Sequence, residues 1–267
     1  QTSSVYTPMT PLGAALALAI GITLGLLGGG GSILTVPTFV YALGLEPKHA
    51  IAMSLPVVGG AAAVGAFQHW RRGGIALHTA LPFGAAAMSG AFLGARLAHQ
   101  LEGRTQLGML AITMLAAATS MLRSSRQPTT GAPVNARAEA AEAQPRRTPW
   151  ALPLIGVAVG ALTGLVGAGG GFLIVPALVI LGGVSMHEAV GTSLLVITMN
   201  TAAAFAGYNG AVAIDWGLVL PFGGCTALGI LLGARLITRV PARTLKLSFA
   251  ILLALIGALI LWQNTHA

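Results

Sequence analysis

The sequence is poor in charged residues. Asp, Glu, Lys and Arg make up 7% of the 267 residues, whereas 55% are hydrophobic, and soluble domains carry about 25% charged residues. So few charges cannot cover a folded surface in water. The composition therefore excludes a soluble globular protein and predicts an all-α polytopic membrane protein, because lipid excludes ionised groups.

Cysteine is nearly absent as well. The single residue of this type, Cys225, lies within an apolar run, so one chain can form neither a disulfide nor a thiolate metal site. The six histidines show no metal-binding spacing such as H-E-x-x-H. We therefore expect no metal, no cofactor and no enzymatic activity. The net charge of +8 would suggest a nucleic-acid partner in a soluble protein, but here the basic residues flank apolar segments, where membrane topology explains them.

The sequence contains an internal repeat. Residues 21–122 align with residues 160–261 without a gap, and nearly a third of the paired positions are identical, which indicates duplication. Leu81-Pro82-Phe83-Gly84 matches Leu220-Pro221-Phe222-Gly223, for example. We therefore predict two transmembrane repeats, 1–122 and 150–267, joined by a flexible aqueous linker at 123–149 that is rich in Arg, Ala, Pro, Ser and Thr.

Each repeat divides into about five apolar segments. In the first half these are residues 12–27, 32–44, 50–69, 75–98 and 105–122. A full span needs about 20 residues, so the first two segments form either two steep helices or a re-entrant pair.

The basic residues predict that the two repeats are inverted relative to each other. If each half crosses the membrane an odd number of times, eleven of the fourteen bases fall on one side, whereas an even number of crossings leaves no bias. The positive-inside rule selects the inverted arrangement, with the linker cytoplasmic and both termini periplasmic. The cytoplasmic set is then Arg71, Arg72, Arg123, Arg126, Arg137, Arg146, Arg147, Arg235, Arg239, Arg243 and Lys246, and the opposite set is Lys48, Arg96 and Arg104.

Glycine runs interrupt the first pair of segments in both halves. Inverted repeats with interrupted helices are typical of secondary transporters, whose site lies where the broken segments meet. Helices expected to begin at Ser32 and Phe172 would direct free N–H groups at a ligand, and such a cradle prefers an anion. The alternative is that the glycines only allow close helix packing. The predicted binding residues are Gly28, Gly29, Gly30, Gly31, Ser32, Gly169, Gly170 and Gly171.

Polar residues within the apolar segments are further candidates. Asn200 and Ser193 fall on roughly one face of a helix, together with Thr201, and Ser54 is the repeat equivalent of Ser193. This face either lines a solute path or forms hydrogen bonds between helices, because an unpaired polar group in lipid is costly.

Four ionisable residues have possible roles at the segment ends. Arg96 and Arg235 are repeat equivalents near opposite surfaces, where they either attract or gate an anion or extend to the interface by snorkelling. His49 and Glu188 are equivalents at the start of the third segments. They either carry protons, if transport is proton-coupled, or cap helices.

A duplicated glycine and proline element carries a family resemblance. It reads Gly28-Gly29-Gly30-Gly31-Ser32-Ile33-Leu34-Thr35-Val36-Pro37 in the first half and Gly167-Ala168-Gly169-Gly170-Gly171-Phe172-Leu173-Ile174-Val175-Pro176 in the second. With this element the chain resembles the sulfite exporter TauE/SafE family, also called the toluene sulfonate uptake permease family (TSUP). The resemblance implies a bacterial inner-membrane transporter of small anions such as sulfite, sulfonates and sulfoacetate.

These observations favour a secondary transporter of a small sulfur oxyanion or organosulfonate that works by alternating access. The alternatives are a transporter of another small organic solute and an anion channel. Two inverted halves in one chain favour alternating access over a pore. The expected partners are the anionic substrate, the bilayer and, if transport is coupled, protons.

Overall fold

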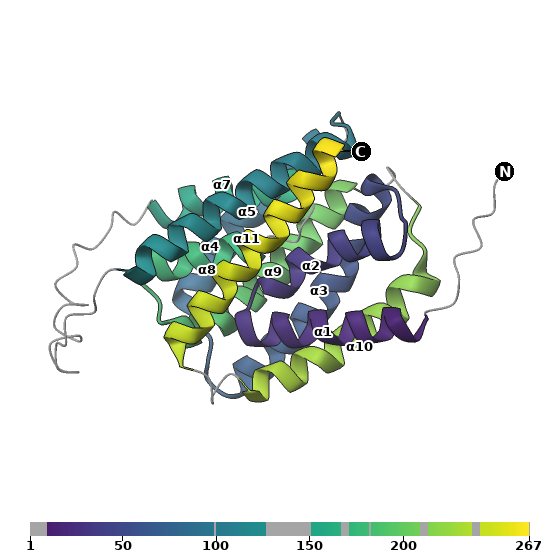
Figure 1. The fold of residues 1–267 in the computed structure, drawn as a ribbon. Helices are drawn as coiled ribbons and strands as arrows, with labels where there is room; N and C mark the ends of the chain where they lie inside the picture. Colours follow the sequence, from purple (N-terminus) through teal and green to yellow (C-terminus); the bar gives the residue numbers. More distant parts are fainter. Residues whose placement is uncertain are drawn as a thin grey trace, which may run out of the picture.

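A computed structural model describes residues 10–98, 100–126, 151–166, 171–181, 183–208, 213–236 and 241–266. These residues are helical apart from short connections (Figure 1). The elements of the first half are α1 (Pro11–Leu27), α2 (Gly30–Pro37), the π-helix η1 (Thr38–Ala42), α3 (Pro47–Arg71), α4 (Leu77–Ala98) and α5 (Gly103–Arg126). Those of the second half are α7 (Ala151–Val166), α8 (Gly171–Pro176), the π-helix η2 (Ala177–Leu181), α9 (Met186–Tyr208), α10 (Trp216–Leu236) and α11 (Ala242–His266).

The helix ends follow from local sequence signals. Thr10 caps α1, because its Oγ1 accepts a hydrogen bond of 3.2 Å from the Gly13 N–H, and Pro11 occupies the first helical position. The π-turns η1 and η2 follow Pro37 and Pro176, which are repeat equivalents. Proline lacks an N–H and cannot continue the ordinary helical bonding. The helix widens after each proline, so that Leu43 N–H donates to the Thr38 carbonyl five residues earlier, at 3.1 Å.

Four of the described helices are long and apolar enough to cross a membrane. They are Pro47–Arg71, Leu77–Ala98, Glu188–Tyr208 and Trp216–Leu236, which are the third and fourth segments of each repeat. The first two segments are shorter, with 17 residues in α1 and 8 in α2. The predicted linker starts within α5, which continues to Arg126, and the rest of its range lies outside the described residues.

Helices of one half pack on helices of the other, in equivalent pairs. α1 packs on α10 and, correspondingly, α7 packs on α4; α3 packs on both α9 and α10, and α9 also on α4. The two halves therefore interlock instead of forming two separate bundles.

The repeat-equivalent helices α3 and α9 run antiparallel. Near the middle of α3, a methyl group placed on Gly59 would lie 2.6 Å from Thr201 Oγ1. Further along α3, a methyl group on Gly65 would lie 3.0 Å from Leu194 Cδ1. At the end of α3, His69 Cβ is 3.0 Å from the corresponding methyl position on Gly191. The order of contacts along the two helices is thus opposite.

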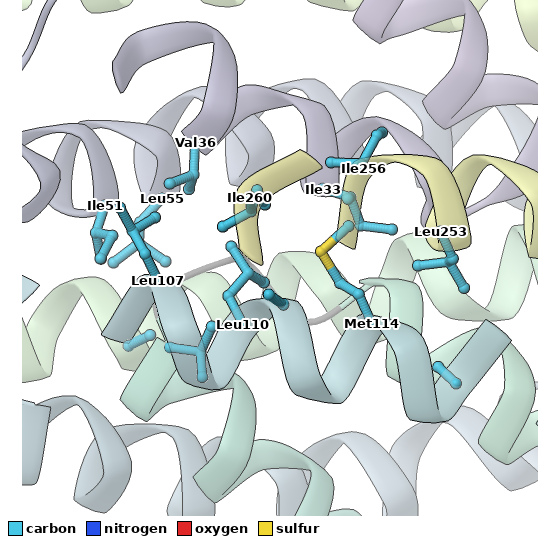
Figure 2. Packing of buried hydrophobic residues seen from close by; sticks show 14 of the residues in the cluster. Ile33, Val36, Ile51, Leu55, Leu107, Leu110, Met114, Leu253, Ile256 and Ile260 are labelled. Atoms are coloured by element: carbon cyan, nitrogen blue, oxygen red, sulfur yellow. The ribbon is translucent and has the colours of Figure 1, made fainter. Parts of the chain in front are cut away.

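The buried core joins both halves. Figure 2 shows Leu110 and Met114 of α5 directed toward Ile256 and Ile260 of α11, with Ile33 of α2 beside them. All five side chains are buried, so α5 and α11, the last helices of the two repeats, close over α2.

Candidate functional site

The first glycine run forms the tip of a helical hairpin that ends inside the protein. Gly28 adopts a φ of +68° and ends α1, with its N–H donating to the Leu24 carbonyl at 2.8 Å. This left-handed conformation favours glycine. α2 then turns back along α1, so that a methyl group on Gly31 would lie 2.5 Å from Leu24 Cβ. Gly28 and Gly29 are both buried, and the turn is therefore enclosed by other helices.

The start of α8 meets this tip. A methyl group on Gly171 would lie 2.8 Å from Gly29 Cα, 3.0 Å from Ser32 Oγ and 2.6 Å from Ile197 Cδ1. Ile197 lies near the middle of α9, so the two backbones approach each other deep in the bundle. We call this contact among Gly28, Gly29, Ser32, Gly171 and Ser193 the glycine junction. Gly30 begins α2, whereas Gly169 and Gly170 lie outside the described residues.

Ser193 connects the second half to the first glycine run. Its hydroxyl donates to the Gly28 carbonyl at 3.0 Å and to the Val190 carbonyl of its own helix at 2.8 Å. A methyl group on Gly28 would lie 2.6 Å from Ser193 Oγ, so only glycine fits this approach. Ser54, the equivalent residue in α3, is also buried and donates to the Ile51 carbonyl at 2.7 Å.

The junction offers backbone groups and hydroxyls within a buried space. Among the described residues, no side chain caps the N-terminus of α2, and the first turn contains no acidic residue. Ser32 Oγ donates to the Gly29 carbonyl at 2.8 Å. A helix N-terminus carries a partial positive charge and unpaired N–H donors, so this end of α2 is chemically suited to an anion. The helices begin at Gly30 and Gly171, slightly earlier than expected from Ser32 and Phe172, because the glycines enter the first helical turn.

Asn200 forms a contact between α7 and α9. Its side-chain N–H donates to Thr163 Oγ1 at 2.8 Å, and Thr163 in turn donates to the Gly160 carbonyl at 3.0 Å. Asn200 is 1% exposed, and its Oδ1 has no hydrogen-bond partner among the described residues. Hydrogen bonding between helices therefore explains how the buried Asn200 amide nitrogen is paired, but it does not provide a partner for the amide oxygen.

Arg96 and Arg235 lie at the exposed ends of α4 and α10. The Arg96 guanidinium lies 5.2 Å from the centre of the Phe92 ring one turn earlier. This position near a helix end matches the snorkelling alternative, and the structure does not bring either arginine to the glycine junction.

His49 and Glu188 lie at the N-terminal ends of α3 and α9. His49 Nδ1 is 3.3 Å from a Glu46 carboxylate oxygen. Glu188 accepts a hydrogen bond of 2.8 Å from the Ser185 hydroxyl, and the Ser185 side chain accepts one of 3.4 Å from the Glu188 N–H. Ser185 is thus the N-cap of α9, and the contact of Glu188 with its hydroxyl matches the helix-capping alternative for Glu188.

The structure also contains a cavity that the sequence did not reveal. A space of about 300 Å³ lies between α3 and α9. Its walls are almost entirely apolar, since the hydroxyls of Thr198 and Thr201 donate back to carbonyls of their own helix. The remaining lining residues are Leu55, Pro56, Gly59, Gly60, Ala63, Ala202 and Phe205.

The spanning helices and the hairpin tip buried among them define a polytopic membrane protein built from two interlocked, related halves. Comparison with known proteins gives the particular family. The sequence model described as "Sulfite exporter TauE/SafE" matches residues 13–260, so the chain belongs to this family of membrane transporters.

Two bacterial relatives cover nearly the whole chain. A "Probable membrane transporter protein" of Xylella fastidiosa (strain 9a5c) is 30% identical over 254 residues, which cover 92% of each chain. The "Probable membrane transporter protein YdhB" of Bacillus subtilis (strain 168) is 26% identical over 247 residues, covering 91% of this chain and 96% of the relative. No solved structure matches.

Proposed function

We propose that this membrane transporter is a secondary transporter of small anions, with sulfite or a related sulfur oxyanion or organosulfonate as its substrate. The observation that carries the proposal is the meeting of Gly29 and Gly171, which brings the interrupted segments of both halves together near the middle of α9. In secondary transporters, substrates bind where interrupted helices of two repeats meet near the bilayer midplane.

The chemistry of the junction supports an anion over a cation. The first turns of α2 and α8 contain no carboxylate, and an intramembrane carboxylate is the usual partner of a cation. The uncapped N-terminus of α2 would supply N–H donors to an oxyanion. The family membership points to the same class of substrate, because the matching family is described as one of sulfite exporters.

Alternating access by two inverted repeats accounts for the arrangement of the helices. The antiparallel contact of α3 with α9 is what two halves of opposite topology would produce. The contact at Gly29 and Gly171 would then lie between the halves, where a small displacement of one against the other opens the junction to either side.

Flux measurements test the substrate and the mechanism. Proteoliposomes that contain the protein should take up sulfite or a related sulfur oxyanion, such as thiosulfate or sulfoacetate, faster than chloride. Measurements with and without a pH gradient then report proton coupling. Equal rates for chloride and sulfite, at channel-like turnover, would contradict the proposal, and transport of a neutral organic solute alone would identify the other alternative.

A variant at the junction tests the site. Gly171→Leu places a side chain against Gly29 Cα, Ser32 Oγ and Ile197 and should abolish flux. Gly224→Leu is the matched control, because a methyl group at this helical position in α10 has nothing within 4 Å. Normal flux in Gly171→Leu would remove the junction from the transport path.

A further inference from the structure

The apolar cavity between α3 and α9 is an open groove on the outer face of these helices. Gly60 is exposed, and a methyl group placed on it has no atom within 4 Å. Across the groove, Ala202 is also exposed, whereas Ser193 and Asn200 on α9 are buried. The groove therefore opens away from the glycine junction.

Small residues form the floor of this groove. Gly59, Gly60, Ala63 and Ala202 lie on the facing sides of α3 and α9, so the surface is depressed where larger side chains would fill it. Both helices are long and apolar enough to span a membrane, and the groove lies near the middle of α3 and in the C-terminal half of α9. In a bilayer its surroundings are hydrocarbon chains.

Exposed residues of α3 continue from the groove to a cationic side chain at the C-terminal end of the helix. Phe67 is 57% and Trp70 59% exposed, and their ring centres are 6.2 Å apart. The guanidinium of Arg71, also exposed, lies 5.9 Å from the centre of the Phe67 ring. An exposed Trp at the end of a spanning helix is typical of the membrane interface.

The length of this path matches one leaflet of a bilayer. Gly60 and Arg71 are separated along α3 by about 16 Å at 1.5 Å per residue, and half of a hydrocarbon core is about 15 Å thick. A lipid with its headgroup at Arg71 would therefore extend its acyl chain to the level of Gly60.

We propose that the groove binds a phospholipid with an anionic headgroup. The end of one acyl chain lies in the groove between α3 and α9, beside Gly60 and Ala63, and the phosphate faces Arg71. The neighbouring Arg72 adds positive charge at this end, although its Nη1 donates to the Ala234 carbonyl at 3.2 Å. The lining carries no charged side chain, so it suits a hydrocarbon chain and not a small oxyanion.

Native mass spectrometry of the detergent-purified protein tests this site. The chain is first equilibrated with mixed micelles of phosphatidylglycerol and phosphatidylcholine, and the retained lipid is then measured. We expect one retained phospholipid per chain, with phosphatidylglycerol enriched over its share in the mixture. Gly60→Phe fills the groove and should lower retention more than tenfold, whereas Gly224→Phe, at an equally open position on α10 outside the groove, should retain the lipid.

A second pair of variants tests the headgroup. Arg71→Gln should lower the affinity for phosphatidylglycerol about fivefold, because one basic residue near the headgroups contributes about 1 kcal/mol. The affinity for phosphatidylcholine should fall less, because its choline group offsets the charge of the phosphate. Arg96→Gln is the control, since Arg96 also lies over a phenylalanine one turn earlier, on α4. Neither readout depends on which solute is transported.

Three results would overturn the proposal. One is equal lipid retention by Gly60→Phe and Gly224→Phe. Another is a dimer that Gly60→Phe converts to monomers, which would make the groove a contact with a second copy of the chain. The third is release of the lipid by millimolar sulfite, which would place the transported anion in the groove.

Discussion

Ser193 lies on α9, and its hydroxyl forms a hydrogen bond with a backbone carbonyl of the other half. Because it donates to the Gly28 carbonyl at 3.0 Å, it fixes the tip of the α1–α2 hairpin against α9. Its second bond, to Val190, is the ordinary bond of a serine to its own helix. Only the first bond links the two halves.

Ser193→Ala removes this link and leaves the buried Gly28 carbonyl without the hydroxyl. A hydrogen bond contributes about 1 kcal/mol to stability, so we expect the free energy of unfolding in micelles to fall by about this amount and the flux of the proposed anionic substrate in proteoliposomes to fall with it. Ser89→Ala serves as the control, since Ser89 on α4 donates only to the Ala86 carbonyl of its own helix, at 2.8 Å. Equal flux in the two variants would show that the Ser193 hydroxyl has no part in transport.

The partner of Asn200 illustrates what residue patterns cannot predict. Helical spacing placed Asn200 and Ser193 on roughly one face, and both are indeed buried. Which residue meets Asn200 depends on how α7 rotates against α9, and this rotation is set by packing across the whole interface. The repeat equivalents of Asn200 and Thr163 are Ala61 and Leu24. These apolar residues cannot form the same hydrogen bond, so the first half gives no precedent for this contact.

At the scale of the elements, two close-packed interfaces that contain glycine join the halves. On α1, a methyl group on Gly21 would lie 2.8 Å from Gly229 Cα of α10, and one on Gly229 would lie 2.8 Å from Gly21 Cα. On α7, a methyl group on Gly164 would lie 2.8 Å from Ala91 Cα of α4. Spacings of four residues between glycines let helix backbones approach closely in lipid, where packing replaces the hydrophobic effect. These spacings, at Gly21 and Gly25 and again at Gly160 and Gly164, are visible in the sequence.

Gly229→Val should separate α10 from α1. The added side chain meets the backbone of Gly21 and Ile22, which cannot move aside as a flexible side chain would. We expect destabilisation by about 1 to 3 kcal/mol, as for overpacked interiors, measured by denaturant unfolding in micelles. Gly224→Val on the same helix should cost little, because its position is open. Similar stabilities for the two variants would contradict the close packing of α1 on α10.

Element boundaries were largely predictable because hydropathy determines them. The expected segments at 50–69 and 75–98 correspond to α3 at Pro47–Arg71 and α4 at Leu77–Ala98. The groove between α3 and α9 was not predictable, because small residues such as Gly60 and Ala202 are equally common in tightly packed interfaces. Only the tertiary structure shows that no described residue of the chain fills the space above them.

On the scale of the whole molecule, the repeat relates the helix contacts of one half to those of the other. α1 on α10 corresponds to α7 on α4, and glycines allow close backbone contact in both interfaces. Each close-packed pair thus contains one helix from each half, while the glycine junction brings the α1–α2 hairpin to the start of α8. A motion that opens the junction without separating these pairs would move α2 and α8 against α3 and α9.

Cysteine labelling tests whether the two halves have opposite topology in the membrane. In a background with Cys225→Ala, single cysteines replace Glu46, before α3, and His78, at the start of α4. In the second half they replace Ser185, before α9, and Ala213, before α10. Glu46, Ser185 and Ala213 lie in connections between helices, His78 lies in the first turn of α4, and all four residues are exposed.

Inverted repeats predict a crossed labelling pattern for these four cysteines. Cysteines at 46 and 213 should react with a membrane-impermeant maleimide added to intact spheroplasts, and those at 78 and 185 only after the membrane is opened. We expect this pattern because the positive-inside rule predicts that Arg71 and Arg72, and with them the connection before α4, are cytoplasmic. The antiparallel pairing of α3 with α9 places the start of α9 beside this connection, where Gly191 meets His69. Glu46 and Ser185 are repeat equivalents, so labelling of both from the same side would mean that the halves are parallel, and alternating access between inverted repeats would then be wrong.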